Sequence, residues 1–520
     1  MFLRYRFDNN NKREDANAMT WKPSVIIVGA GLSGLCAAAK LKKELNIEAT
    51  VFELEKDVGG TWLVNTYPGC ACDVPSHLYS FSFEPSTSWN KKYAGQEEIL
   101  DYLRMVANKY DVMRHIQFQT EVRKIHWNDE QKHYEVDVSK VGTNDLVRHV
   151  AEVVISGPGA LRIPNYPEKF RSFKGPSFHT AKWDKSVNLE GKKVAIIGSG
   201  ASAIQVVPAI APKVKELLVY QRSPSWIVPR RNYNYYTIVK KFFEYVPYSQ
   251  YLYRSAIFLY NELTFLTFGR NTWLTETMSK VALRLATRHR VTSIQDDELR
   301  EKLTPKYQMG CKRILVSDDF YPAMQRDNVR LITDGIERVV DDGIITAKGK
   351  EDIDVLILAT GFDVGYLGYV TAYMAPAKVE GENGANFDGI INNIQTYLGI
   401  CMTKYPNMYL LLGPNTGLGH NSVIFMIECQ VDFALQAIKK MMEDNLATLE
   451  VKESVQREFS QQLKMNLKNT VFATKCDSWY ADANGDVYTL WGGNCISYWN
   501  HTKEFDINHF ESTPRAKKNV

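Results

Sequence analysis

The sequence has no CxxC pair and no long uninterrupted run of apolar residues. Its eight cysteines are scattered over 520 residues, so we expect reduced thiols in an intracellular, cytoplasmic protein. The segment from Met1 to Thr20 is polar and has no apolar core, which argues against a signal peptide. Arg254, Asn261 and Glu262 interrupt the most apolar stretch, residues 251–268, so no membrane-spanning helix is expected. The stretch remains compatible with a buried or surface-dipping helix.

A strong excess of one charge sign is also missing. The chain has 63 Lys and Arg against 59 Asp and Glu, which leaves a net charge of +4. A balance this close to neutral argues against nucleic acid as the main partner. The length, with 45% hydrophobic residues, is sufficient for two or three domains.

Two segments follow the strand, glycine turn, helix and strand order that is typical of dinucleotide-binding units. The predicted elements of the first are residues 24–28, 32–45 and 50–54, and those of the second are 193–197, 201–210 and 217–221. Two further apolar strands end at glycine, over residues 153–159 and 355–363. Such segments suit points where the chain crosses between domains, so we expect the second unit to be inserted within the first.

The first unit carries the pattern Gly29-x-Gly31-x-x-Gly34. Gly29 permits a tight turn, Gly31 lets a pyrophosphate approach the backbone, and Gly34 lets the helix pack closely on the strand. The free N–H groups of the helix N-terminus then face the phosphates. Glu53, 19 residues after Gly34, can accept hydrogen bonds from a ribose diol. The sequence therefore predicts a dinucleotide site here.

The second unit carries Gly198-x-Gly200-x-x-Ala203, but its second strand ends without an acid. It ends instead in Gln221-Arg222-Ser223. Arg222 would attract a 2′-phosphate, whereas a carboxylate at this position would repel it. The second unit therefore favours NADPH over NADH.

Two dinucleotide sites in one chain predict an electron relay. NADPH would deliver a hydride to a permanently held flavin, which can pass electrons to O₂. A disulfide acceptor would normally require a CxxC pair, so oxygen is the expected acceptor.

Further motifs lie outside the two glycine turns. They are Phe173-x-Gly175-x-x-x-His179-x-x-x-Trp183-Asp184, Gly59-Gly60-Thr61-Trp62 with Tyr67-Pro68-Gly69 and Asp73, Lys312-Arg313 within GCKR, and Ala359-Thr360-Gly361-Phe362-Asp363. In this order they resemble the signatures of type I Baeyer–Villiger monooxygenases, from about Ser24 to Tyr498. The related N- and S-oxidising flavin monooxygenases carry Tyr or Phe where Trp183 stands.

The resemblance implies an α/β fold with two Rossmann-like domains and a helical subdomain. We expect a flexible tail over residues 1–23, an FAD-binding domain split over 24–158 and 355–520, and an NADP-binding domain over 159–354. The helical insertion is expected at about 233–303. The implied enzyme uses FAD, NADPH and O₂ to insert one oxygen atom beside a ketone carbonyl, through a peroxyflavin, and the product is an ester or lactone.

The resemblance also implies roles for individual residues. Arg313 would be the catalytic arginine, oriented by Asp73, and His179 and Trp183 would belong to the interdomain linker. Glu53 would bind the FAD ribose and Val122 would meet the adenine. The FAD-binding set is Gly29, Gly31, Gly34, Glu53, Thr61, Trp62, Leu63, Val64, Ala71, Cys72, Asp73, Tyr79 and Val122. The NADPH-binding set is Gly198, Ser199, Gly200, Ala201, Ser202, Ala203, Ile204, Arg222, Ser223 and Lys312; Arg313 is also expected to bind a cofactor, and no metal ligand is predicted.

Two alternatives stay open at the level of the sequence. One is a flavin monooxygenase that oxidises nitrogen or sulfur, or hydroxylates carbon; Trp183 and Arg313 argue against it. The other is a flavin-binding protein without oxygenase activity. The expected small-molecule partner is a ketone or related lipophilic compound, whose identity the sequence does not give.

Overall fold

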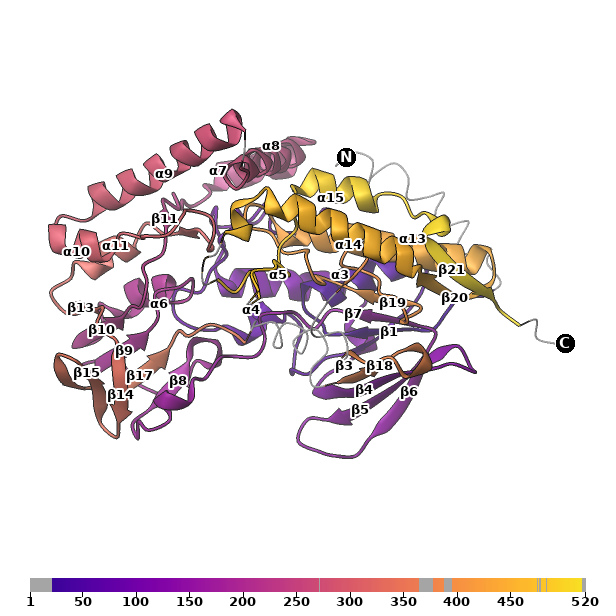
Figure 1. Ribbon diagram of the computed structural model, residues 1–520, viewed down its shortest axis with the longest axis horizontal. Coiled ribbons are helices and arrows are strands. Elements are labelled where there is room, and N and C mark those ends of the chain that lie inside the picture. The colour runs from indigo at the N-terminus through magenta and orange to yellow at the C-terminus, as the bar shows by residue number, and fades with distance from the viewer. Residues whose placement is uncertain are drawn as a thin grey trace.

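The computed structural model describes residues 21–270, 272–363, 377–387, 395–474, 476, 478–482 and 484–516. Residues 1–20 of the predicted tail lie outside this part of the chain. Figure 1 shows two β-sheet units side by side, with long helices along one edge of the molecule. The α/β class predicted from the sequence, with two dinucleotide-binding units and a helical subdomain, is confirmed.

The first unit is built on a parallel five-stranded sheet of order β19-β7-β1-β2-β3. Its strands are β1 (Val25–Val28), β2 (Thr50–Phe52), β3 (Ile116–Gln117), β7 (Val153–Ser156) and β19 (Met408–Leu410). The apolar strands are buried because helices cover the sheet. Helix α3 (Leu32–Lys40) continues through a π-helical turn (Leu41–Leu45), and its small residues allow close packing against α13 (Val423–Glu443).

The second unit is a parallel sheet of order β13-β10-β9-β17-β8. Its strands are β8 (Ser177–His179), β9 (Lys193–Ile197), β10 (Glu216–Tyr220), β13 (Val329–Ile332) and β17 (Val355–Leu358), with helices α6 (Ala203–Ile210) and α11 (Phe320–Met324). The chain leaves the first sheet after β7 and returns to it at β19, so the second sheet is nested within the first unit. Strand β17 pairs with β9 and β8, so the domain boundary predicted at residue 355 lies too early. An apolar strand that ends at glycine fits either sheet, and only strand pairing decides between them.

Smaller sheets and helices complete the two units. The remaining strands are β4 (Thr120–Asn128), β5 (His133–Lys140), β6 (Val147–Ala151), β11 (Ile227–Val228), β12 (Leu315–Val316), β14 (Ile336–Val340), β15 (Gly343–Thr346), β16 (Gly349–Asp352), β18 (Lys378–Glu380), β20 (Leu446–Val451) and β21 (Phe510–Pro514). The remaining helices of these units are α4 (Thr61–Val64), α5 (Gln96–Lys109), α14 (Glu453–Lys468) and α15 (Cys495–Thr502). Strand β18 joins the β4–β5–β6 sheet, so the returning chain contributes to both sheets of the first unit.

The predicted helical insertion is present between β11 and β12. It consists of α7 (Thr237–Tyr245), α8 (Ser249–Thr264), α9 (Trp273–Ser293) and α10 (Asp297–Lys302). Helices α7, α8 and α9 lie along the upper edge of the molecule in Figure 1. Among the described residues, no helix is long and apolar enough to cross a membrane.

The expectation that all eight cysteines are reduced thiols is wrong for two of them. Cys311 and Cys476 form a disulfide across a sequence separation of 165 residues. A missing CxxC pair excludes only a local bond, and the fold brings these distant cysteines together. The disulfide ties the segment that contains Lys312 and Arg313 to the C-terminal part of the chain.

Candidate active site

The first glycine turn has the geometry that its pattern predicts. Gly29 has φ +92°, and a Cβ atom there would lie 2.6 Å from the carbonyl oxygen of Gly157. A Cβ atom on Gly34 would collide with the carbonyl of Gly29. Gly31 precedes α3 as its N-cap, with no side-chain cap and no acid in the first turn of the helix. The helix therefore offers its first N–H groups to an anion.

Glu53 and Val122 line one cavity, together with Gly29, Pro158 and Arg162. Glu53 is buried and accepts hydrogen bonds from the backbone N–H groups of Ala30 at 2.6 Å and Glu55 at 2.8 Å. Burial raises the pKa of this carboxyl group, and the two N–H groups counteract part of that effect. The predicted ribose and adenine contacts thus lie at the same site. Arg162 was missed, although it follows the predicted strand-to-glycine segment closely.

The predicted flavin-lining residues form α4, directly beside the first glycine turn. Gly60 is the N-cap of α4 with φ +51°, and its Cα atom lies 3.5 Å from where a Cβ atom of Gly31 would be. Trp62 is buried, and its indole N–H donates to the hydroxyl of Tyr79 at 3.2 Å. The rings of Trp62 and Tyr79 meet edge to face at 5.6 Å.

Arg313 and Asp73 form an ion pair although 240 residues separate them. The Nε atom of Arg313 donates to Oδ2 of Asp73 at 3.2 Å, and Nη2 donates to the same oxygen. The attraction of Asp73 raises the pKa of Arg313. Burial works to raise the pKa of Asp73, but Arg313 outweighs it and holds that pKa below its usual range. The two side chains are 33% and 32% exposed, so the pair is partly accessible.

The loop that carries Asp73 is also fixed by the second unit. Gln205 of α6 accepts a hydrogen bond from the Tyr67 hydroxyl at 2.9 Å and donates to the carbonyl of Ala71 at 3.0 Å. Arg230 donates to the carbonyl of Cys72 at 2.9 Å. The motif pattern identified neither Gln205 nor Arg230, because their role depends on how the two units meet.

The second glycine turn is open at the position where a phosphate would approach. Gly198 has φ +114°, and its Cβ atom would lie 2.5 Å from the carbonyl oxygen of Ala359, whereas nothing lies within 4 Å of a Cβ atom on Gly200. The hydroxyl of Ser199 donates to the carbonyl of Ser223 at 3.1 Å. This bond holds the turn beside the exposed Arg222–Ser223 segment.

Lys312 reaches the same region through the pairing of β11 with β12. These short strands bring the segment after Arg222 alongside the segment after Arg313. The ammonium group of Lys312 lies over the ring of Tyr307 at 5.1 Å. Tyr307 in turn accepts the indole N–H of Trp226 through its backbone carbonyl at 3.0 Å. The two cations predicted to bind a 2′-phosphate are therefore carried by neighbouring segments.

His179 is the last residue of β8, and Trp183 follows the 3₁₀ turn Thr180–Lys182 that comes next. His179 is fully buried, accepts a hydrogen bond from the N–H of Ala181 at 3.1 Å, and meets Phe362 edge to face. Burial lowers the pKa of His179 to about 4, so its imidazole is neutral at physiological pH. Trp183 packs edge to face on Phe178 at 5.0 Å. His179 thus packs the 173–184 fingerprint against Phe362 of the 359–363 segment, and a role in an interdomain linker stays a prediction.

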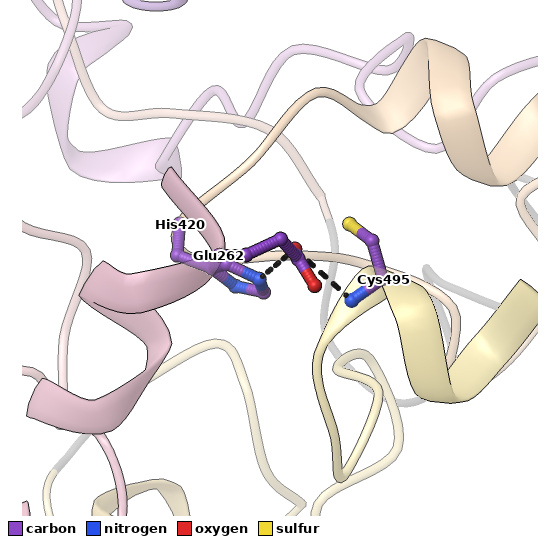
Figure 2. Close-up of side chains that lie close together, drawn as sticks. All are labelled: Glu262, His420 and Cys495. Carbon is purple, nitrogen blue, oxygen red and sulfur yellow. Dashed lines mark hydrogen bonds and ion pairs between the residues drawn. The ribbon is translucent and has the colours of Figure 1, made fainter. Parts of the chain in front are cut away.

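Glu262 of α8 is the centre of a buried polar cluster that sequence reasoning did not identify as a site (Figure 2). The cluster contains His420 and Cys495, and their ligand atoms lie within 4.8 Å of those of Glu262. The carboxylate accepts hydrogen bonds from His420 Nε2 at 3.2 Å, Asn421 Nδ2 at 2.8 Å, and the backbone N–H groups of Cys495 at 3.2 Å and Ile496 at 3.1 Å. Burial alone would raise the pKa of Glu262, but these donors lower it. The carboxylate oxygens of Glu262 thus already accept hydrogen bonds from groups of the protein itself.

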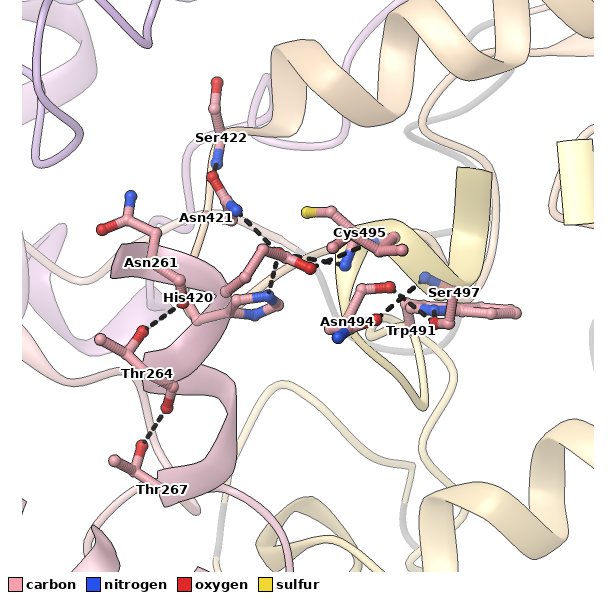
Figure 3. Close-up of polar contacts among 12 residues, drawn as sticks. Asn261, Thr264, Thr267, His420, Asn421, Ser422, Trp491, Asn494, Cys495 and Ser497 are labelled. Atoms are coloured by element: carbon pink, nitrogen blue, oxygen red, sulfur yellow. Dashed lines mark hydrogen bonds and ion pairs between the residues drawn. The ribbon is translucent and has the colours of Figure 1, made fainter. Parts of the chain in front are cut away.

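The Glu262 cluster connects the helical insertion to the active-site loop. Glu262 accepts hydrogen bonds both from Asn421 and from the first N–H groups of α15, and Figure 3 shows Asn421 and Cys495 on these two segments. The same loop places the carbonyl of Leu418 at 3.5 Å from Nη1 of Arg313. Glu262 therefore anchors α8 to the loop that borders the Arg313–Asp73 pair. The only signal for it in the sequence was indirect, an acidic residue within an apolar stretch.

Comparison with known proteins places these features in a family. The model of the family described as flavin-binding monooxygenase-like matches residues 22–371. A Baeyer–Villiger monooxygenase of Pseudomonas aeruginosa is 38% identical over 522 residues, covering 98% of this chain and 96% of the relative. A Baeyer–Villiger monooxygenase of Streptomyces coelicolor is 35% identical, covering 94% of this chain and 92% of the relative.

Solved structures with the same fold also resemble this chain. Cyclohexanone monooxygenase from Rhodococcus sp. Phi1 bound to NADP⁺ superposes with a TM-score of 0.82 at 26% identity, covering 95% of this chain and 99% of that one. Steroid monooxygenase bound to NADP superposes with a TM-score of 0.81 at 25% identity, covering 95% of this chain and 100% of that one. The similarity thus extends over both sheet units.

Proposed function

This chain belongs to the flavin-binding monooxygenase-like family and is a type I Baeyer–Villiger monooxygenase that uses FAD and NADPH, and we propose that each cofactor occupies one of its two sheet units. The first unit would hold FAD and the nested second unit would hold NADPH. The alternatives that the sequence left open, N- or S-oxidation and a flavoprotein without oxygenase activity, receive no support from the relatives named above.

The first unit fits FAD at three points. The open N-terminus of α3 and the side-chain-free Gly31 suit a pyrophosphate. The cavity between Glu53 and Val122 suits the adenosine part, with the Glu53 carboxylate as acceptor for the ribose hydroxyls. Helix α4, with Trp62 packed against Tyr79, would border the flavin ring.

The second unit fits NADPH better than NADH. The space at Gly200 and the N-terminus of α6 suit the pyrophosphate. Arg222 and Lys312 are cations on adjacent segments, and both would bind the 2′-phosphate of NADPH. NADH has only a hydroxyl group at that position. The bond from Ser199 to Ser223 fixes the backbone next to Arg222.

Reduced FAD supplies the oxygen chemistry by activating O₂, and the protein must stabilise the negative charge that develops on oxygen. Arg313 can do so because its guanidinium stays charged at any working pH. Asp73 holds it in one orientation through two hydrogen bonds, so no reorganisation is needed during the reaction. Arg313 would thus stabilise the oxyanion formed as a ketone is attacked, and the product is an ester or lactone.

The observation that carries the proposal is the partly exposed Arg313–Asp73 pair beside the α4 segment. Part of the guanidinium is exposed while Asp73 holds its orientation, so a bound molecule can reach it. Tyr79, which packs on Trp62, is close enough to both charges for them to affect its pKa, although burial is the main cause that raises it. This supports a flavin position next to the pair.

A substrate panel tests this assignment. Purified holoenzyme with NADPH and ¹⁸O₂ would be incubated separately with a cyclic ketone, a steroid ketone and an aryl sulfide. We expect ester or lactone products that carry one ¹⁸O atom from at least one ketone. Sulfoxide formation without any ketone product would contradict the proposal.

A further inference from the structure

Helix α8 buries its charged residues and exposes leucines, which is the reverse of the usual pattern for a helix at a protein surface. Its charged residues Arg254 and Glu262 are 2% and 7% exposed, whereas Leu252, Leu259 and Leu263 are 70%, 55% and 59% exposed. The leucines are spaced by seven and four residues, so they share one face of the helix. The buried Arg254 donates to the carbonyls of His77 at 2.6 Å and Ser80 at 2.8 Å, which fixes the rotation of the helix. The apolar face therefore points away from the protein.

The two neighbouring helices expose apolar faces as well. Helix α7 has no buried residue, and its exposed Ile238, Phe242 and Tyr245 recur at helical spacing. On α9, Leu274, Val281 and Leu285 are exposed on one side, and Trp273 at its start is 78% exposed. Helix α7 contacts α8, and a short 3₁₀ turn over residues 265–267 connects α8 with α9. In Figure 1 the three helices lie along the same edge of the molecule.

We call this surface the apolar helical face. It consists of Tyr236, Ile238, Phe242, Tyr245, Leu252, Leu259, Tyr260, Leu263, Trp273, Leu274, Val281 and Leu285. Single exposed apolar residues are ordinary, but a set of this size on adjacent helices marks an interaction surface. Tyrosine and tryptophan, which are frequent in it, are the side chains enriched where a membrane meets water.

The charged residues around the apolar helical face indicate which kind of partner fits it. The same helices and their connection carry the surface cations Lys240, Lys241, Arg270, Lys280, Arg284 and Arg288, against the exposed anions Glu244 and Glu276. The whole chain has a net charge of only +4, so this segment is locally basic. A basic rim around an apolar helix face is the pattern of helices that lie in the headgroup layer of anionic lipids.

We propose that the apolar helical face docks the enzyme onto the surface of an anionic phospholipid bilayer. The leucines of α8 insert between lipids while the lysines and arginines of α7 and α9 contact the headgroups. A second copy of the chain is a poorer occupant. A symmetric pairing of this face would bring the basic rims of both copies together, and their repulsion would oppose it.

Vesicle sedimentation of the purified holoenzyme tests the proposal. The vesicles would contain phosphatidylcholine alone or phosphatidylcholine mixed with phosphatidylglycerol. We expect binding to the mixed vesicles, weaker binding to phosphatidylcholine, and loss of the difference at high salt because screening removes the charge contribution. A holoenzyme that stays in the supernatant with both vesicle types would overturn the proposal.

Two variants and one control locate the surface. The triple variant Leu252→Ser/Leu259→Ser/Leu263→Ser removes apolar area that the protein itself does not bury, and we expect its binding to fall at least about tenfold. The double variant Lys280→Glu/Arg284→Glu should lose at least about tenfold, on the mixed vesicles only. The control variant Leu146→Ser/Val147→Ser/Val150→Ser changes equally exposed apolar residues beside and within β6, and it should bind like wild type.

Activity and oligomeric state complete the test. Unchanged oxidation of a water-soluble ketone by the leucine variant would show that it remains folded. Equal vesicle binding by wild type and an active leucine variant would overturn the proposal. So would sedimentation velocity in which wild type is a dimer and the leucine variant a monomer, since the face would then be a self-interface.

Discussion

Replacing Arg222 with alanine tests how the second unit selects its cofactor. Arg222 lies two residues after the end of β10, and the Ser199–Ser223 bond fixes the adjacent backbone. A charge-assisted hydrogen bond contributes about 1.5–3 kcal/mol. Arg222 is exposed, so the lower end of that range applies, and about 1.4 kcal/mol corresponds to a tenfold change in rate. We therefore expect Arg222→Ala to lower kcat/KM for NADPH by about tenfold.

The assay compares NADPH with NADH for the same ketone. NADH has no 2′-phosphate, so its kcat/KM should be unchanged in Arg222→Ala. Lys215→Ala is the matched control, because Lys215 is an exposed cation at the opposite end of the same strand, and neither cofactor should respond to its loss. If Arg222→Ala weakened both cofactors equally, or neither, the reasoning about the 2′-phosphate would be refuted.

Three other outcomes follow from the same structure. Glu53→Ala should purify with less FAD per protein because the ribose loses its acceptor, and unchanged flavin content would place the FAD site elsewhere. His179→Ala should slow turnover severalfold while keeping FAD, since it loosens a packed linker; normal turnover would show that the linker histidine has no functional role. Reduction of the Cys311–Cys476 bond should lower the melting temperature, because closing a loop of this length contributes up to about 5 kcal/mol. Cys311→Ser/Cys476→Ser protein should be insensitive to reductant, and an equal response would point to another target.

The two glycine turns were predictable because their causes are local. Gly29 and Gly198 need a positive φ that other residues rarely adopt, and Gly34 needs close packing within the same unit. Glu53 follows at a spacing set by one helix and one strand. These features depend only on short stretches of chain, so they can be recognised from the sequence pattern.

Features that depend on distant segments were harder to predict. The Arg313–Asp73 pair was expected only from the family resemblance, since no spacing rule connects residues 240 positions apart. The Cys311–Cys476 bond and the Glu262 cluster were missed for the same reason. The β17 strand was assigned to the wrong sheet because its apolar sequence would be buried equally well in either.

The partition of products in Arg313→Ala tests the central claim most directly. NADPH oxidation, hydrogen peroxide and ester or lactone would be measured in one reaction, with Arg313→Lys as a variant that keeps the charge but loses the two-point contact with Asp73. Arg313→Ala should retain FAD and still consume NADPH. Its oxygenated product should fall by about 10²–10³, with peroxide formed instead, because one fixed stabiliser of the oxyanion is gone. Product formation by Arg313→Ala at the wild-type rate would contradict the account.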